Sequence, residues 1–122
     1  MVTIDDVRAL AGGLPRSYEI LVRGRVKFRV GRIVYLAFSR DETTLGFAFP
    51  REEREAFLQA FPDKFERPDA ADLRYNWLVV RLAAIDLTEL RELVFDAWRM
   101  VVPKRLAAAS DEELLRSLPG DD

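Results

Sequence analysis

The 122-residue sequence contains neither cysteine nor histidine. Without cysteine the chain has no disulfide framework, no thiolate nucleophile and no thiolate metal ligand. The absence of histidine removes the commonest general base and the commonest protein ligand of zinc, copper and iron. Carboxylate or tyrosine chemistry stays open, but no nucleophile motif or glycine-rich phosphate loop is present. We therefore expect a non-enzymatic protein with no cofactor and no metal.

The sequence also lacks a long hydrophobic run. No apolar stretch approaches the ~18 residues of a membrane-spanning helix, and the N-terminus has no apolar core of the kind found in signal peptides. We therefore expect a cytoplasmic protein that does not contact the membrane. Its length and its 49% content of apolar residues favour a single domain with a substantial core.

Charge is distributed unevenly along the chain. The net charge is −2, yet residues 16–40 contain seven basic residues and one acidic residue. That segment therefore carries +6, and the remainder of the chain carries −8. Such asymmetry produces a one-sided electrostatic field and suggests an anionic partner for the basic side.

The basic segment contains a period-two pattern. From Arg25 to Val30, basic and apolar residues alternate, so a β-strand sends the three basic side chains to one face and the three apolar ones to the other. Gly31 marks a hairpin turn, and a second apolar strand follows over residues 32–39. We expect the basic side chains to face solvent. The basic ribbon is defined as Arg23, Arg25, Lys27, Arg29 and Arg32.

The rest of the sequence predicts helices packed against an antiparallel sheet. The predicted element order is α-β-β-β-α-β-α, an α+β fold. Residues 73–85 are the most apolar stretch and predict a central strand buried on both faces. Residues 18–22 are either a short strand or an extended lead-in. The predicted helices cover residues 3–11, 50–61 and 87–102, and the further strands cover residues 25–30, 32–39 and 43–49.

Several short fragments, in this order and at this spacing, resemble the MmcQ/YjbR-like family of small bacterial proteins. They are Gly-Leu-Pro at 13–15, Val-Lys-Phe-Arg-Val-Gly-Arg at 26–32, Tyr-Leu-Ala at 35–37, Gly-Phe-Ala-Phe-Pro at 46–50, Arg-Pro at 67–68, Arg-Tyr-Asn-Trp at 74–77 and Asp-Ala-Trp at 96–98.

The resemblance implies a domain over residues 1–106 and a C-terminal tail over 107–122, which contains a possible short helix. It also implies a CyaY-like or double-wing fold. The family is commonly described as DNA-binding and has no agreed catalytic residues to carry over. Typical members often have a histidine in the segment before the tryptophan, where this chain has residues 73–76, Leu-Arg-Tyr-Asn.

The basic ribbon has two functional interpretations and one structural alternative. As a nucleic-acid interface, it would contact phosphates of DNA or another polyanion. In a protein–protein interaction module, the same face would dock an acidic partner, with an apolar sheet edge or the long helix contributing a groove. The structural alternative is a solvated sheet face interleaved with acidic residues from the helix at 50–60 or from the tail.

A third hypothesis places a small-molecule-binding or enzymatic pocket near Arg67, Arg74 and Tyr75. The two arginines could converge on a carboxylate or phosphate. Alternatively, Arg67 anchors its loop through an ion pair, and Arg74 pairs with Asp72 or another acid. Tyr75 and Trp77 would alternate on the central strand as an aromatic platform, or Trp77 would pack beneath the long helix.

Overall fold

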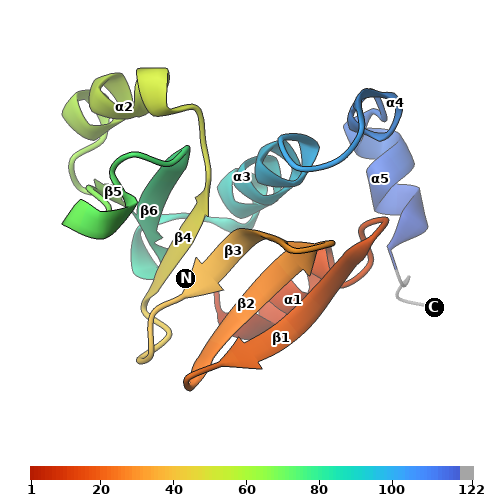
Figure 1. Cartoon of the computed structure of the whole chain (residues 1–122), viewed down its shortest axis with the longest axis horizontal. Helices are drawn as coiled ribbons and strands as arrows, with labels where there is room; N and C mark the ends of the chain where they lie inside the picture. The colour runs from red at the N-terminus through yellow and green to blue at the C-terminus, as the bar shows by residue number, and fades with distance from the viewer. Residues whose placement is uncertain (119–122) are drawn as a thin grey trace.

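The protein, described here by a computed structural model over residues 1–118, contains a six-stranded sheet with strand order β1-β2-β3-β4-β6-β5. All neighbouring strands are antiparallel, which confirms the predicted α+β class. Helices α1 and α3 pack against one face of the sheet (Figure 1). The strands are β1 (Ser17–Val22), β2 (Arg25–Val30), β3 (Ile33–Phe38), β4 (Thr44–Ala48), β5 (Phe65–Glu66) and β6 (Trp77–Arg81). The helices are α1 (Ile4–Ala11), α2 (Arg54–Ala60), α3 (Leu87–Arg99), α4 (Lys104–Ala107) and α5 (Asp111–Ser117).

The two helices on the sheet begin with the capping boxes that their sequences predict. In α1 the box joins Thr3 and Asp6, and in α3 it joins Asp86 and Glu89. In each box the second residue, Asp6 or Glu89, accepts a hydrogen bond from the backbone N–H of the cap residue. This N–H is one of the donors that a helix start leaves unpaired. α3 ends at Arg99, three residues before the predicted end. Leu87, the first residue of α3, is exposed.

Tight turns set the register of the first three strands. Gly31 has a φ of +60° and joins β2 to β3, as predicted. β1 and β2 are joined by Arg23 and Gly24, both with positive φ (53° and 79°). Positive φ at both central residues is typical of the two-residue turn that matches the twist of a hairpin. Residues 18–22 are therefore part of a full strand, paired along its whole length with β2.

The prediction of a long central strand over residues 73–85 is wrong. Only β6 is extended there; residues 73–76 form turns, and a 3₁₀ turn follows at Leu82–Ala84. Leu78 and Val80 of β6 point into the core, whereas Trp77 points to the opposite face and is half-buried. Because side chains alternate along a strand, Trp77 cannot pack beneath α3.

The helix predicted from Pro50 begins later than expected. Pro50 precedes a 3₁₀ turn, Arg51–Glu53, and α2 starts at Arg54. The Arg54 side chain is only 7% exposed. Its guanidinium donates hydrogen bonds to the carbonyl oxygens of Leu73, Tyr75 and Trp77 at 2.6, 3.2 and 3.1 Å. This fork fixes α2 against the turns that precede β6.

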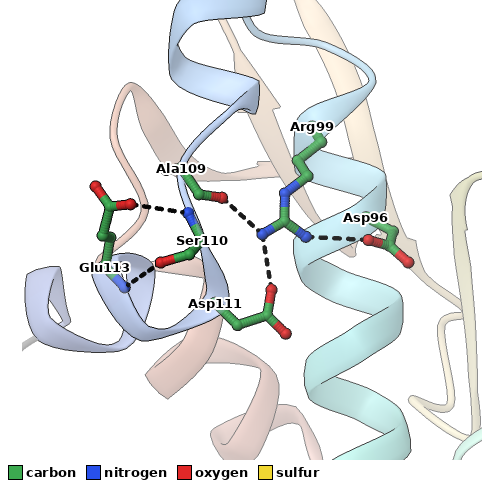
Figure 2. A network of polar contacts seen from close by, with 6 residues as sticks. All are labelled: Asp96, Arg99, Ala109, Ser110, Asp111 and Glu113. Atoms are coloured by element: carbon green, nitrogen blue, oxygen red, sulfur yellow. Dashed lines mark hydrogen bonds and ion pairs between the residues drawn. The ribbon is translucent and has the colours of Figure 1, made fainter.

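The C-terminal segment is held to α3 by Arg99, as Figure 2 shows. The Arg99 guanidinium contacts Asp96 at 3.0 Å and donates to the Ala109 carbonyl at 2.9 Å and to Asp111 at 2.7 Å. Ser110 and Glu113 form the capping box of α5, and Leu114 is buried in the core. Residues 107–118 of the predicted tail thus contain a docked helix, and residues 119–122 lie outside the described part of the chain.

We expect Arg99→Ala to destabilise the fold by about 1–3 kcal/mol, because a half-buried carbonyl and carboxylate lose their donor. Amide hydrogen exchange in α5 should accelerate more than exchange in the sheet. Arg99→Lys should restore only part of the loss, since a lysine lacks the planar fork. Arg105→Ala on exposed α4 is the control. Unchanged exchange in α5 would show that the arginine does not hold the helix.

Candidate nucleic-acid interface

The basic ribbon lies on the sheet face that points away from α1 and α3, called here the open face. Along β2, Val26, Phe28 and Val30 are buried, while the basic side chains between them point to the other side. The predicted alternation is confirmed. The basic side chains of β2 are half-buried, not fully exposed as we expected. The two neighbouring strands flank them, with Ile20 of β1 on one side and Ala37 of β3 on the other side of Lys27.

No cation of the basic ribbon forms an ion pair with any acid of residues 1–118. Elsewhere in this part of the chain, acidic residues lie within 4.0 Å of Arg8, Lys64, Arg67, Arg81 and Arg99. Glu19, the one acid of the basic segment, pairs with Arg8 of α1 at 3.0 Å. Glu55 of α2 pairs with Arg67. Within residues 1–118 no acid of helix 50–60 or of the tail is interleaved with the ribbon, whereas a solvated sheet face, the other part of the structural alternative, stays open.

Repulsion within the ribbon affects Lys27 most clearly. Burial lowers the pKa of the Lys27 ammonium, and the positive charges of Arg25 and Arg29 lower it further. The carboxylate of Asp72 opposes these effects but does not cancel them. Because a lowered pKa means that the folded protein disfavours the charged form, the half-buried charge of Lys27 between two arginines costs folding free energy. A bound anion would relieve that cost.

The ribbon arginines keep most of their donors free for a ligand. Arg25 uses its Nε–H to donate to the Phe38 carbonyl at 2.9 Å, which aligns its guanidinium along the sheet. The Nε–H of Arg29 is buried and has no acceptor among the described residues. Arg23 and Arg32 are exposed in the turns at the two ends of β2. The five cations therefore follow the full length of one strand.

A hollow of about 380 Å³ lies at the β4 side of the open face. Trp77 forms part of its wall by lying across Gly46, where an added Cβ would come within 2.5 Å of the indole nitrogen. Only glycine at position 46 leaves room for this ring. Because positive and negative side chains both line the hollow, the hollow is less suited to a polyanion than the ribbon beside it. The charged residues that line it are Arg25, Arg40, Glu66, Arg67, Asp69 and Asp72.

The pocket predicted near Arg67, Arg74 and Tyr75 is not assembled as expected. Arg67 lines the hollow, but one nitrogen of its guanidinium donates to both carboxylate oxygens of Glu55 at 2.8 and 2.6 Å, which supports the loop-anchoring alternative. Arg74 stacks over the ring of its neighbour Tyr75, 4.9 Å from the centroid, and forms no ion pair with Asp72. Tyr75 is exposed and is not part of β6.

Comparisons with known proteins place these features in a family. The family model described as YjbR matches residues 12–100. The chain is 28% identical to the uncharacterized proteins Rv2570 of Mycobacterium tuberculosis and Mb2600 of Mycobacterium bovis, over 89% of this chain and 95% of each relative. The crystal structure of Deinococcus radiodurans protein DR2400, with a DUF419 domain, is similar at a TM-score of 0.73 and 26% identity, covering 98% of this chain and 91% of that one. No helix of residues 1–118 could span a membrane.

Proposed function

The chain belongs to the YjbR family, and we propose that it is a non-enzymatic domain that binds nucleic acid through its basic ribbon. One observation carries the proposal: five cations along a single strand have no acidic partner among residues 1–118. Burial lowers the pKa of Lys27 and the neighbouring cations lower it further, so this charge is costly unless an anion compensates it. A phosphate backbone presents such anions in a regular row.

The ribbon suits backbone contact rather than base reading. Arginine side chains bind phosphates with planar, two-pronged geometry, and phosphate contacts position a protein on nucleic acid without selecting a sequence. Tyr18 lies opposite Arg29 on the open face and is partly exposed. Its ring offers a surface on which a base of a single strand can stack.

The acidic remainder of the molecule limits the affinity. Outside residues 16–40 the chain carries −8, and this charge repels a polyanion at low salt, where screening is weak. We expect dissociation constants in the micromolar range or weaker near physiological salt. If four or five phosphates are neutralised, the slope of log K against log salt for duplex DNA should be about −4.

Fluorescence anisotropy with labelled duplex and single-stranded oligonucleotides at low salt tests the proposal. Arg23→Glu with Arg32→Glu should abolish binding, because it replaces two of the five ribbon cations with anions. Both residues are exposed in turns, so their replacement should leave the sheet intact. Arg105→Glu with Arg116→Glu changes the net charge equally on exposed residues of α4 and α5 and should retain most of the binding. No binding by the wild type, or equal binding by both double variants, would overturn the proposal and favour an acidic protein as the partner.

Lys27→Gln tests whether the charge of Lys27 contributes to DNA binding or only to the stability of the fold. Removing a charge that the folded state disfavours should leave the free energy of unfolding unchanged or raise it by a few tenths of a kcal/mol. The salt slope of DNA binding should fall by about 1, the share of one phosphate contact. Urea unfolding and salt titration measure the two effects. A clear loss of stability with an unchanged slope would mean that Lys27 serves the fold alone.

A further inference from the structure

A second concave site lies on the opposite side of the sheet, between α2, β5 and α3. It has a volume of about 590 Å³, within the range of small-molecule sites in proteins. Figure 1 shows α2 above the end of the sheet where β5 and β6 lie, and α3 nearer the middle of the sheet, against β3 and β4. We call this cavity the phenylalanine groove. The residues that give it this name are Phe47, Phe49, Phe57, Phe61 and Phe65.

These five rings form a connected aromatic cluster at the edge of the main core, which includes Phe47. The chain has eight phenylalanines, and the other three, Phe28, Phe38 and Phe95, are fully buried. Within the groove the rings of Phe49 and Phe57 are 4.8 Å apart between centroids, with Phe57 and Phe65 5.7 Å apart. The rings hold one another in place, yet they leave a cavity unfilled. Phe61 at its mouth is 43% exposed.

The rim of the groove is acidic. Glu53, Glu89, Glu92 and Asp96 line it, and Lys64 is its one cation. Lys64 pairs with Glu89, and Asp96 pairs with Arg99. Glu53 and Glu92 are exposed, and no ion pair within residues 1–118 involves either of them. Two uncompensated carboxylates therefore stand at the mouth of an aromatic cavity.

We propose that the phenylalanine groove binds a small amphipathic cation, an aliphatic or aromatic body that carries a protonated amine. The body would fill the space between the rings, where burial of apolar surface supplies the affinity. The amine would lie at the rim near Glu53 and Glu92. Aromatic ring faces also attract cations. An anionic ligand of the same shape is disfavoured by the rim, so charge decides which amphiphile binds.

The position of α2 supports a preformed site. Arg54 fixes the start of the helix to the turns before β6, and Phe57 lies one helical turn further on, toward the groove. The groove therefore does not depend on a ligand to assemble its walls. This site is separate from the basic ribbon, which lies on the other face, so either proposal can fail without the other.

A matched pair of probes tests the site: octylammonium and octanoate share an apolar body and differ in the sign of the head group. In NMR titrations at neutral pH and low salt, octylammonium should shift amide resonances of α2 and α3. Octanoate should bind at least ten times more weakly. Shifts confined to the open face, equal affinities for the two probes, or no binding of octylammonium at millimolar concentration would each overturn the proposal.

Variants test whether the acidic rim determines the preference for octylammonium over octanoate and whether the phenylalanine rings supply the affinity for both probes. Glu53→Gln with Glu92→Gln should weaken octylammonium binding about tenfold, since each exposed carboxylate contributes a few-fold. Glu42→Gln with Glu112→Gln removes two exposed carboxylates elsewhere and should change little. Phe61→Gln should weaken both probes while thermal unfolding shows an intact fold. Equal effects of the two double variants would overturn the role of the rim.

Discussion

Replacing Trp98 with alanine should cost about 3–5 kcal/mol of unfolding free energy. Trp98 is fully buried in α3, and truncation removes a large apolar side chain and leaves a cavity. The indole Nε1–H also donates to the Pro15 carbonyl at 2.9 Å, so the variant leaves that acceptor unpaired. Domains of this size have a total stability of about 5–15 kcal/mol. The loss is therefore a large fraction of the whole.

Urea denaturation measures this loss as a fall in the midpoint. With a slope of about 1–3 kcal/mol per molar urea, the midpoint should fall by roughly 1–5 M. Trp98→Phe keeps most of the apolar volume and should cost about 1–2 kcal/mol, mainly the hydrogen bond. Leu21→Ala, at a side chain that is 71% exposed, is the surface control. Equal midpoints for Trp98→Ala and Leu21→Ala would place the tryptophan outside the core.

The parts of the fold that depend on local patterns could be predicted from the sequence. The alternation over β2, the turn at Gly31 and the capping boxes of α1 and α3 each depend on residues a few positions apart. The bulge between Phe28 and Arg29 in the pairing with β3 has no comparable signal. It adds a residue on β3 and is decided by how two strands pack together.

The errors around β6 have a long-range cause. Residues 73–76 directly precede the apolar strand β6 in the sequence, but three backbone carbonyls of this region turn toward Arg54, about twenty residues earlier. Similarly, Trp77 lies on the open face because Gly46 of β4 leaves room for its ring. Neither partner is adjacent in sequence. The basic ribbon was predictable because its cations lie close together in the sequence, on β2 and its two flanking turns, whereas the phenylalanine groove combines four separate segments.

One signal for Arg54 was present in the sequence but was not used. Arg54 precedes Phe57, Leu58 and Phe61 by three, four and seven residues, and this spacing puts all four on one face of a helix. A cation in an apolar stripe predicts a buried, hydrogen-bonded arginine, since buried charges need partners. Here the partners are carbonyl oxygens, and no carboxylate of the described chain forms an ion pair with the guanidinium.

We expect Arg54→Met to destabilise the protein by at least about 3 kcal/mol. Replacing a buried ion pair with apolar residues is sometimes favourable, because both charges are removed together. Arg54 differs, since the carbonyl oxygens of Leu73, Tyr75 and Trp77 belong to the backbone and stay in place. Each buried acceptor that loses its donor costs about 1–3 kcal/mol. The loss of acceptors should therefore outweigh the gain from removing a desolvated charge.

Two further variants test whether the hydrogen bonds of the Arg54 guanidinium to the three carbonyls account for this loss. Arg54→Lys keeps the charge but offers a single ammonium, so it should recover only part of the loss. Arg51→Ala removes an exposed arginine that donates to one carbonyl, that of Arg74, and should cost less than about 1 kcal/mol. In Arg54→Met, amide exchange should accelerate in α2 and residues 73–77 beyond the global change, and octylammonium binding should weaken because α2 forms one wall of the groove. A variant as stable as the wild type, with an unchanged groove, would mean that the three carbonyls find other donors and that packing alone positions α2.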